Sequence, residues 1–257
     1  MITIGLVTIN YKNAEDTIGL LSSLKRIHTE GIKIRQYIVD NASNDGSQEK
    51  IKKAFPKIIS LKSLKNLGFA GGNNQGIARA LKDGCDYVLL INNDTTISDK
   101  SFFTKMLKIR GDIISPRVRY RQNGKNLTDY GGRIDYFFGR NTHYLATPKT
   151  SPDYYSGVCL MIKKRVFSKI SGMDESYFLY YEDADFCLNA AKMGFQIKDC
   201  PNTYINHHLS SSTNKLGKKK LIILADSHLR FCQKHLPIYS KPLYLSYNLY
   251  LRLKTLI

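Results

Sequence analysis

The sequence lacks the features that mark a zinc protein, a disulfide-rich domain or an integral membrane protein. Its five cysteines form no CxxC pair, are odd in number and lie far apart, so neither a zinc site nor a disulfide framework is predicted. No stretch reaches the roughly 20 apolar residues that a membrane-spanning helix requires. The first residues carry no basic segment and run directly into a strand pattern. We therefore expect no signal peptide and a cytoplasmic location.

Acidic residues are also scarce relative to basic ones. The 257 residues include 39 Lys and Arg against 21 Asp and Glu, which gives a formal net charge of +18. The imbalance is greatest at the end of the chain, where nine basic residues after position 200 accompany a single acidic one, Asp226. Such an excess predicts an anionic partner: nucleotide phosphates, nucleic acid or an anionic membrane.

The hydrophobic patterns alternate between strand and helix along the first part of the chain. Strands are expected at 2–9, 36–40, 58–61 and 87–91, and helices at 14–28, 47–54, 71–82 and 98–109. This alternation predicts an α/β fold with a mainly parallel central sheet flanked by helices. Residues 117–150 show no clear period, which indicates an inserted hairpin or a mobile region. Later segments predict strands at 155–162 and 195–200 and helices at 182–193 and 221–234.

The most informative segment is the buried strand at 87–91, which ends in Asn92, Asn93 and Asp94. Open α/β sheets bind ligands beyond the carboxyl ends of their strands. A single carboxylate beside polar side chains suits Mg2+ or Mn2+ when diphosphate oxygens supply the remaining ligands. The alternative is an ordinary Asn/Asp turn without a ligand.

Two further loops follow the same logic. Asp40 ends the second strand and precedes a polar turn, where it could bind a nucleoside or cap the next helix, although Asp45 or Ser47 could supply that cap. The glycine-rich segment 66–76 precedes a helix and could bring backbone amides close to an anion, or could be a helix entry without a ligand. It is not the dinucleotide fingerprint GxGxxG and does not follow the first strand.

Carboxylates and histidines gather in the second half. Glu182, Asp183 and Asp185 open a predicted helix, where the helix dipole favours negative charge, but three carboxylates exceed what capping requires. A carboxylate held in a cleft can act as general base toward a hydroxyl. Asp183 and Asp185 face different ways on a helix, so we expect one to face the reaction and the other to be structural. His207 or His208 could complete a metal site, or both could be structural.

The tail at 238–257 combines leucines near helical spacing, several tyrosines and scattered lysines and arginines. This pattern predicts a helix that lies on an anionic membrane. The alternatives are a helix packed on the domain and a contact with another protein.

Seven motifs, in this order, resemble the family 2 glycosyltransferases with the GT-A fold, and bacterial rhamnosyltransferase-like members that build O-antigens and capsules in particular. They are VTINY at 7–11, VDNAS at 39–43, NLGFAGGNN at 66–74, LINND at 90–94, SGVCLM at 156–161, YYEDAD at 180–185 and HHLSSS at 207–212. The resemblance implies a GT-A domain over 1–213, with a nucleotide-sugar half at 1–115 and an acceptor and catalytic half at 116–213. A basic amphipathic helical tail at 214–257 would follow.

The resemblance also implies roles for individual residues. Asp183 stands where the family places its catalytic base, and Asp94 stands in the family's DXD metal motif, with His207 as a late metal ligand and Glu182 and Asp185 as structural or acceptor-side residues. The remaining expected contacts with the nucleotide sugar are Thr8, Asn10, Asp40, Asn41, Asn66, Gly68, Gly71, Asn73, Asn92 and Asn93. One departure matters: the DXD carboxylates are reduced to a single Asp, which weakens the expectation of strict metal dependence.

These implications together predict an inverting hexosyltransferase that uses Mn2+ or Mg2+. The expected donor is dTDP-rhamnose or a UDP-hexose, and the expected acceptor is a saccharide or lipid-linked saccharide. We expect the protein to lie on the inner face of the cell membrane, with no nucleic acid partner. The competing hypotheses are a non-enzymatic protein that binds nucleic acid or another anionic polymer, which the charge suggests, and a Rossmann oxidoreductase, which the missing glycine fingerprint disfavours.

Overall fold

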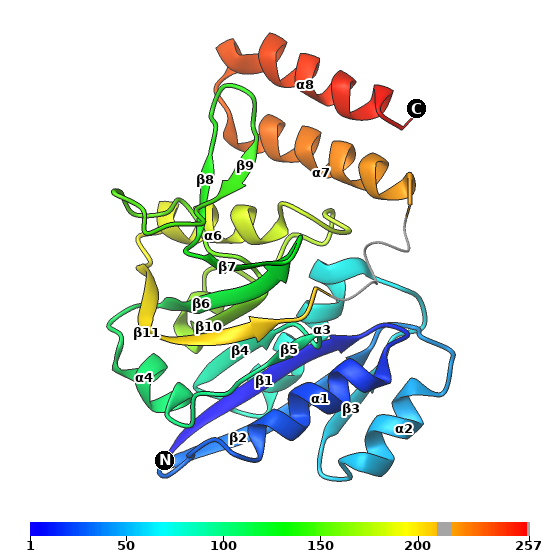
Figure 1. Cartoon of the computed structure of the whole chain (residues 1–257), viewed down its shortest axis with the longest axis vertical. Coiled ribbons are helices and arrows are strands. Elements are labelled where there is room, and N and C mark those ends of the chain that lie inside the picture. Colours follow the sequence, from blue (N-terminus) through cyan, green and yellow to red (C-terminus); the bar gives the residue numbers. More distant parts are fainter. Residues whose placement is uncertain (210–216, 256–257) are drawn as a thin grey trace.

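The computed structural model describes residues 1–209 and 217–255 (Figure 1). Its centre is a nine-stranded sheet in the order β3-β2-β1-β4-β10-β6-β11-β5, with β7 paired to β6. The strands are β1 (Ile2–Asn10), β2 (Ile32–Asp40), β3 (Ile59–Lys62), β4 (Tyr87–Ile91), β5 (Thr95–Thr96), β6 (Ile113–Gln122), β7 (Lys125–Asp129), β10 (Cys159–Lys163) and β11 (Ile197–His207). A separate two-stranded sheet joins β8 (Gly132–Ile134) and β9 (Asn141–His143).

Helices flank both faces of the sheet, as the alternating pattern predicts. They are α1 (Ala14–Leu24), α2 (Ser47–Ala54), α3 (Gly68–Lys82), α4 (Phe102–Lys108), α5 (Lys164–Phe167), α6 (Glu182–Lys192), α7 (Lys219–His235) and α8 (Lys241–Leu253). A 3-10 turn, η2 (Ile238–Ser240), joins the last two helices. The predicted α/β fold with a mainly parallel sheet is confirmed.

The register of the parallel strands decides where the polar loop residues meet. Strands β3, β2, β1 and β4 run parallel, and Asn10 at the end of β1 lies opposite Asp40 at the end of β2. Strand β4 ends beside them, so Asn92 to Asp94 leave the sheet at the same edge. Strand β10 runs antiparallel to β4, and its Cys159 pairs with Ile91. The sheet therefore delivers its polar loops to one side, at the carboxyl ends of the parallel strands.

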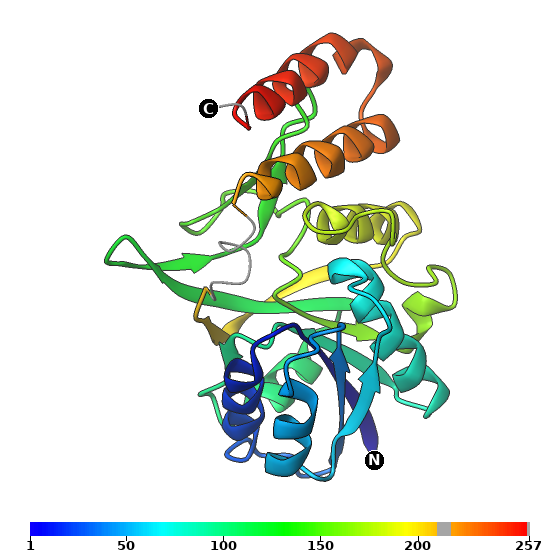
Figure 2. The ribbon, with the colours of Figure 1, turned by 90° about the vertical axis from the view of Figure 1, so that its right-hand side faces the viewer.

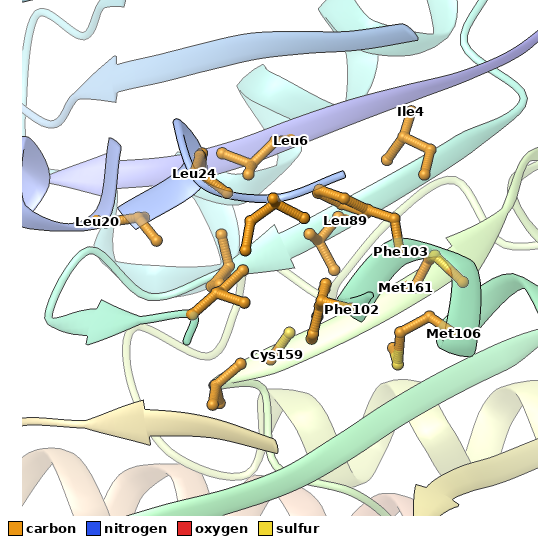
Figure 3. Close-up of a cluster of buried hydrophobic side chains, with 14 of the residues drawn as sticks. Ile4, Leu6, Leu20, Leu24, Leu89, Phe102, Phe103, Met106, Cys159 and Met161 are labelled. Atoms are coloured by element: carbon orange, nitrogen blue, oxygen red, sulfur yellow. The ribbon is translucent and has the colours of Figure 1, made fainter. Parts of the chain in front are cut away.

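Two layers of apolar side chains hold the helices to this sheet. On one face, α1 and α4 bury Leu20, Leu24, Phe102 and Phe103 against the strands (Figure 3). On the other face, α3 lies so close that a Cβ at Gly76 would stand 2.2 Å from Val7 Cγ1. Each fully buried large side chain contributes about 1.5–3 kcal/mol to folding. Helices packed on both faces therefore hold the sheet edge that carries the polar loops in a fixed position.

The segment without a clear period folds into two hairpins. Strand β6 turns at Asn123 into β7, and β8 turns into β9, which lies beside α7 and α8 (Figure 2). The beginning of β6 is a strand that the sequence pattern does not reveal. Its Pro116 pairs with Cys200, and the register then shifts before Tyr204. Proline cannot donate to a ladder and is tolerated at such irregularities, which explains why the pattern is interrupted.

The last two helices form a pair at one end of the molecule (Figure 1). Helix α8 buries Tyr244, Asn248 and Leu251, and the Asn248 side chain donates to the carbonyl of Ala225 in α7 at 2.6 Å. The predicted division between residues 213 and 214 lies outside the described part of the chain. No helix within 1–209 and 217–255 is long and apolar enough to cross a membrane.

Candidate functional site

A cavity of about 420 Å³ opens where β1, β2 and β4 end. Its volume falls in the range of small-molecule sites, roughly 300–1,000 Å³. Eight of the residues expected to bind nucleotide sugar or metal line it: Asn41, Asn66, Gly68, Asn73, Asn92, Asn93, Asp94 and His207. Residues from four separate motifs therefore meet at one surface.

Asp94 and His207 lie against each other at the wall of this cavity. The His207 Nε2 atom is 3.2 Å from the Asp94 Oδ1 atom. The reason is a strand pairing, because β5 begins directly after Asp94 and pairs with β11 so that Thr95 lies opposite His207. The ring of His208 instead meets the Thr96 hydroxyl at 3.1 Å. His207 is therefore the histidine that contacts the Asp94 carboxylate, whereas His208 contacts Thr96.

This pair fits a divalent cation that is held jointly with a ligand. Within the described residues, no cluster of three or more His, Cys, Asp or Glu side chains forms a complete metal site. Mg2+ and similar ions are commonly held by one or two carboxylates, with substrate phosphates supplying other ligands. Imidazole and carboxylate together suit Mn2+ as well. The donor set thus suits an ion that binds together with a diphosphate.

The two asparagines before Asp94 have different neighbours. The backbone N–H of Asn92 donates to the carbonyl of Val158 at 2.9 Å, which ties this turn to the strand region before β10. The side chain of Asn93 donates to the Thr17 hydroxyl of α1 at 3.1 Å. Both asparagines line the cavity, but Asn93 is partly committed to holding α1 in place.

Thr8, Asn10 and Asp40 lie beneath the cavity, not in its wall. Asn10 donates to Asp40 Oδ1 at 3.1 Å, and Asp40 Oδ2 accepts the Ser43 N–H at 3.2 Å. Thr8 is fully buried, and its hydroxyl has no hydrogen-bond partner among the described residues. Asn10 and Asp40 thus fix the ends of β1 and β2 and the turn that follows. Direct contact of Thr8, Asn10 and Asp40 with a nucleotide stays a prediction.

Three backbone N–H groups at the start of the glycine-rich segment are bonded within the protein, so they are not free to bind the anion that the sequence allows for there. The N–H of Leu67 donates to Asn41 Oδ1, that of Gly68 to Asn66 Oδ1, and that of Phe69 to the carbonyl of Phe178 at 2.7 Å. The start of α3 is therefore capped from within the protein. The Asn41 side chain also donates to Asn66 Oδ1, so the two side-chain amides form one continuous polar surface in the wall of the cavity.

The glycines themselves serve close packing. A Cβ at Gly71 would stand 2.8 Å from Leu67 Cβ, and a Cβ at Gly68 would stand 2.2 Å from the Phe178 carbonyl oxygen. Gly68 also has a φ of +71°, a conformation that residues with a side chain rarely adopt. Gly68 lines the cavity, whereas Gly71 lies behind it. Asn73, one turn further along α3, completes this wall.

Asp183 lies beside Gly157, which also packs close to Phe69, a residue that lines the cavity. Its Oδ2 accepts the Gly157 N–H at 2.9 Å, and its Oδ1 accepts the Ala184 N–H at 2.8 Å. A Cβ at Gly157 would stand 3.2 Å from the Phe69 ring, which itself lines the cavity. Burial raises the pKa of the half-buried Asp183 carboxyl, and these N–H groups and the charge of His143 counteract the rise in part. A raised pKa suits a general base.

The turn that aims Asp183 is strained. Tyr180 and Tyr181 both adopt positive φ, +72° and +68°, immediately before α6 begins. Two consecutive bulky residues in this region are costly, and such strain is found where the surrounding structure imposes it. Here the Tyr181 hydroxyl donates to the Gly139 carbonyl at 3.1 Å, which ties the turn to the loop between β8 and β9.

Glu182 and Asp185 have separate surroundings. Glu182 is buried, its Oε2 has no hydrogen-bond partner among the described residues, and burial together with the charge of Asp183 raises its pKa well above the ordinary value. Asp185 is also buried and pairs with His235 at 2.7 Å and Lys234 at 2.8 Å, both at the end of α7. Asp185 therefore fastens α7 to α6, while Asp183 faces the cavity side.

Several residues in or near the site have no signal in the sequence pattern. Gln122, Phe178, Leu179 and Lys220 line the cavity but occupy ordinary hairpin, loop and helix positions, whereas Phe69 lies within the glycine-rich motif but is not marked out there by its residue type. Asp16 in α1 is a further case: burial raises its pKa, and the nearby charge of Asp94 raises it further. Only the Asn13-x-x-Asp16 spacing at the start of a helix could have drawn attention to it.

The fold is that of the GT-A glycosyltransferases. The mannosyltransferase PcManGT of Pyrobaculum calidifontis, solved with GDP-Man and Mn2+, superposes with a TM-score of 0.60 at 13% identity, over 98% of this chain and 70% of that one. At this identity the likeness concerns the fold alone.

A model of the family described as glycosyl transferase family 2 matches residues 5–171. The chain therefore belongs to glycosyl transferase family 2. It is 29% identical to the low-salt glycan biosynthesis hexosyltransferase Agl10 of Haloferax volcanii over 77% of this chain and 64% of that protein. It is 24% identical to the N-acetylglucosaminyl-diphospho-decaprenol L-rhamnosyltransferase of Mycobacterium tuberculosis over 87% of this chain and 84% of that protein. The chain thus spans about two thirds of the length of the Haloferax relative.

Proposed function

We propose that this protein transfers a sugar from a nucleotide-sugar donor to a saccharide or lipid-linked saccharide, with inversion at the anomeric carbon, in the synthesis of a surface polysaccharide. The observation that carries the proposal is the Asp94–His207 pair, 3.2 Å apart, in the wall of a cavity that Phe69 also lines. The Asp183 carboxylate lies behind Phe69, hydrogen-bonded to Gly157. The rhamnosyl name of the mycobacterial relative and the dTDP-rhamnosyl name of a relative from Shigella flexneri favour dTDP-rhamnose as donor, with UDP-hexoses as the alternative.

The donor would lie in the cavity between α3 and the end of β4. Asn41, Asn66 and Asn73 offer amide donors and acceptors there, and Phe69 and Phe178 offer apolar contact. Asp94 and His207 would hold a Mn2+ or Mg2+ ion, which when bound supplies positive charge for the diphosphate. Lys220 adds a further cation to the cavity wall. Such fixed charges stabilise a leaving diphosphate.

Asp183 would act on the acceptor. Two backbone N–H groups orient its carboxylate, which retains lone pairs to accept a proton from an acceptor hydroxyl. The acceptor oxygen forms a bond to the anomeric carbon as the bond to the diphosphate breaks, so the proton passes to Asp183 and the nucleoside diphosphate departs. One base and a single displacement give inverted configuration.

The C-terminal pair of helices would bind an anionic membrane surface. Leu245, Leu249 and Leu253 are 40%, 58% and 50% exposed on α8, while its opposite side packs on α7. Lys241 and Lys254 lie at the two ends of α8 and flank this apolar stripe in the chain. Apolar side chains with flanking cations suit the surface of an anionic bilayer. A lipid-linked acceptor would then be reached from the inner face of the cell membrane.

The proposal is tested by thermal stabilisation with UDP, dTDP, GDP and NAD, each with and without Mn2+. A ligand that binds the folded state alone raises the melting temperature by mass action. A rise with UDP or dTDP that grows when Mn2+ is present supports the transferase and identifies the nucleotide. No rise with any nucleotide, together with salt-sensitive binding of oligonucleotides, would favour an anionic-polymer-binding protein, which the charge of +18 also suits.

A further inference from the structure

His143, at the end of β9, is held by a carboxylate from another strand. Its Nδ1 atom is 2.8 Å from Oδ2 of Asp129, the last residue of β7. The other oxygen of Asp129 accepts the Gly131 N–H at 2.8 Å, so the carboxylate is fixed as well. The Nε2 atom of His143 lies 3.1 Å from the Tyr154 hydroxyl. Both ring nitrogens thus face oxygen atoms that can accept a hydrogen bond, which suits the protonated imidazolium.

This pair adjoins the region of Asp183. Tyr154 begins the short segment that leads to Gly157, whose N–H donates to Asp183 at 2.9 Å. Gly132 of β8 bridges to Tyr154 as well, so the β8–β9 hairpin is fastened to the same segment. The hairpin that carries His143 and the loop that orients Asp183 are therefore one connected unit.

The charged and titratable groups that act on Asp183 are Glu182, His143, Asp129, Tyr154 and Cys187. Of these five groups, His143 alone can carry a positive charge. The His143 side chain is 37% exposed, so its proton exchanges with solvent, whereas Glu182 is buried. The other four of these groups, all within the described part of the chain, are neutral or negative.

We propose that His143, oriented by Asp129, is the cation that keeps the Asp183 carboxylate ionised and ready to accept a proton. His143 is a positioning residue that acts through Asp183, and the inference rests on the proposed role of Asp183 as base. Burial and the charge of Asp183 raise the pKa of Glu182, which favours the neutral form of this neighbour.

The directions of the titrations agree with this role. Burial lowers the pKa of His143, but the bond to Asp129 and the charges of Asp129 and Asp183 raise it above the ordinary value overall. The positive charge of His143 in turn lowers the raised pKa of Asp183. Asp183 accepts a proton from an acceptor only above its own pKa. Loss of the imidazolium should therefore move the acidic limit of turnover to higher pH, by roughly one unit for a nearby charge.

The first experiment measures the coupling without any turnover. The ring signals of His143 are titrated by NMR in the wild type, in Asp183→Asn and in Asp129→Asn, with His143→Gln identifying the signal. Because coupling between two sites is reciprocal, Asp183→Asn should lower the titration midpoint of His143, and Asp129→Asn should lower it further. An unchanged midpoint in Asp183→Asn would overturn the proposal, whatever the activity of the protein.

The second experiment measures pH profiles of nucleoside diphosphate release from dTDP-rhamnose and UDP-glucose. His143→Gln should move the acidic limb upward, and His143→Lys, which restores a cation, should move it back. His28→Gln, at an exposed position far along the chain, is the matched control and should leave the limb in place. An acidic limb at the same pH in His143→Gln and His143→Lys would overturn the proposal. If Asp183→Asn shifts the titration of His143 but the wild type releases no nucleoside diphosphate from either donor, the interaction of His143 with Asp183 is supported and the proposed function is contradicted.

Discussion

The two sides of the cavity region, the side proposed to bind the donor and the side proposed to bind the acceptor, are built in different ways. On the donor side, β1 to β4 run parallel, each polar loop follows its own strand, and the relevant residues lie close in the chain to the pattern that positions them. On the acceptor side, contacts join distant segments, such as the Tyr181 hydroxyl with the Gly139 carbonyl and Asp185 with His235. The donor side therefore follows largely from local rules, with the exception of His207, which the β5–β11 pairing brings to Asp94, while the acceptor side depends on tertiary contacts throughout.

The sharpest test of the acceptor side is Asp183→Asn. The amide keeps the size of the side chain but cannot accept a proton, so turnover should fall by about 10²–10⁴-fold. Donor binding should persist because Asp183 does not line the cavity. Nucleoside diphosphate release and thermal shift with UDP or dTDP measure the two properties separately. Turnover near that of the wild type would contradict the assignment of the base.

Asp185→Ala would break the acceptor side without touching the donor side. It leaves His235 and Lys234 beside an empty position, and losing one member of a buried pair costs about 3–5 kcal/mol in the free energy of unfolding. Asp174→Ala is the matched control, because it removes a partner of the same Lys234 at a more exposed position and should cost about 1 kcal/mol or less. Urea unfolding of both variants gives the comparison. Equal losses would show that Asp185 does not anchor α7.

Asp94→Ala tests the donor side. It should weaken Mn2+-dependent binding of the diphosphate by roughly 10–100-fold, which is the loss found when a residue that only supports a metal ligand is replaced. Binding without Mn2+ should change little. Calorimetric titration with UDP or dTDP, with and without the ion, measures both. Glu30→Gln, an exposed substitution elsewhere, is the control. Unchanged binding in the presence of Mn2+ would remove Asp94 from the proposed metal site.

The smallest expected effect concerns the exposed face of α8. A double variant, Leu249→Glu and Leu253→Glu, places two negative charges on the apolar stripe and should weaken binding to phosphatidylglycerol vesicles by at least about tenfold. Leu64→Glu alters a fully exposed leucine before α3 and serves as control. Co-sedimentation with vesicles measures the difference. If both proteins sediment equally, the stripe serves another purpose than membrane contact.

Much of the donor side was predictable from the sequence. The strands at 2–10 and 87–91 and the helix at 47–54 have clear periods, and the polar residues that follow the strands lie at one edge of the sheet as expected. The pattern could not reveal which of these residues reach the surface. Thr8, Asn10 and Asp40 have the right position along the chain but are covered by the turn that Ser43 completes.

The acceptor side was less predictable for a physical reason. Asp129, His143 and Tyr154 come from three segments without helical or strand periodicity, and their meeting depends on hairpins whose register is set by tertiary contacts. The separation of Asp183 and Asp185 into different environments was predictable, because residues two apart face different ways on a helix. The partners of these two carboxylates could not be predicted, because they come from the segment before β10 and from the end of α7.

The pairing of β5 with β11 has a consequence for how the protein folds. The contact between Thr96 and His208 joins residues 112 positions apart, so it closes after a long stretch of chain has been ordered. Loops of this length carry a large entropy cost before the contact forms, and such pairings form slowly. During synthesis, β1 to β4 emerge first and can assemble while His207 is still absent. A chain truncated before β11 would lack His207, one of the two proposed metal ligands. The proposed metal site can therefore be completed only after the last strand has been added to the sheet.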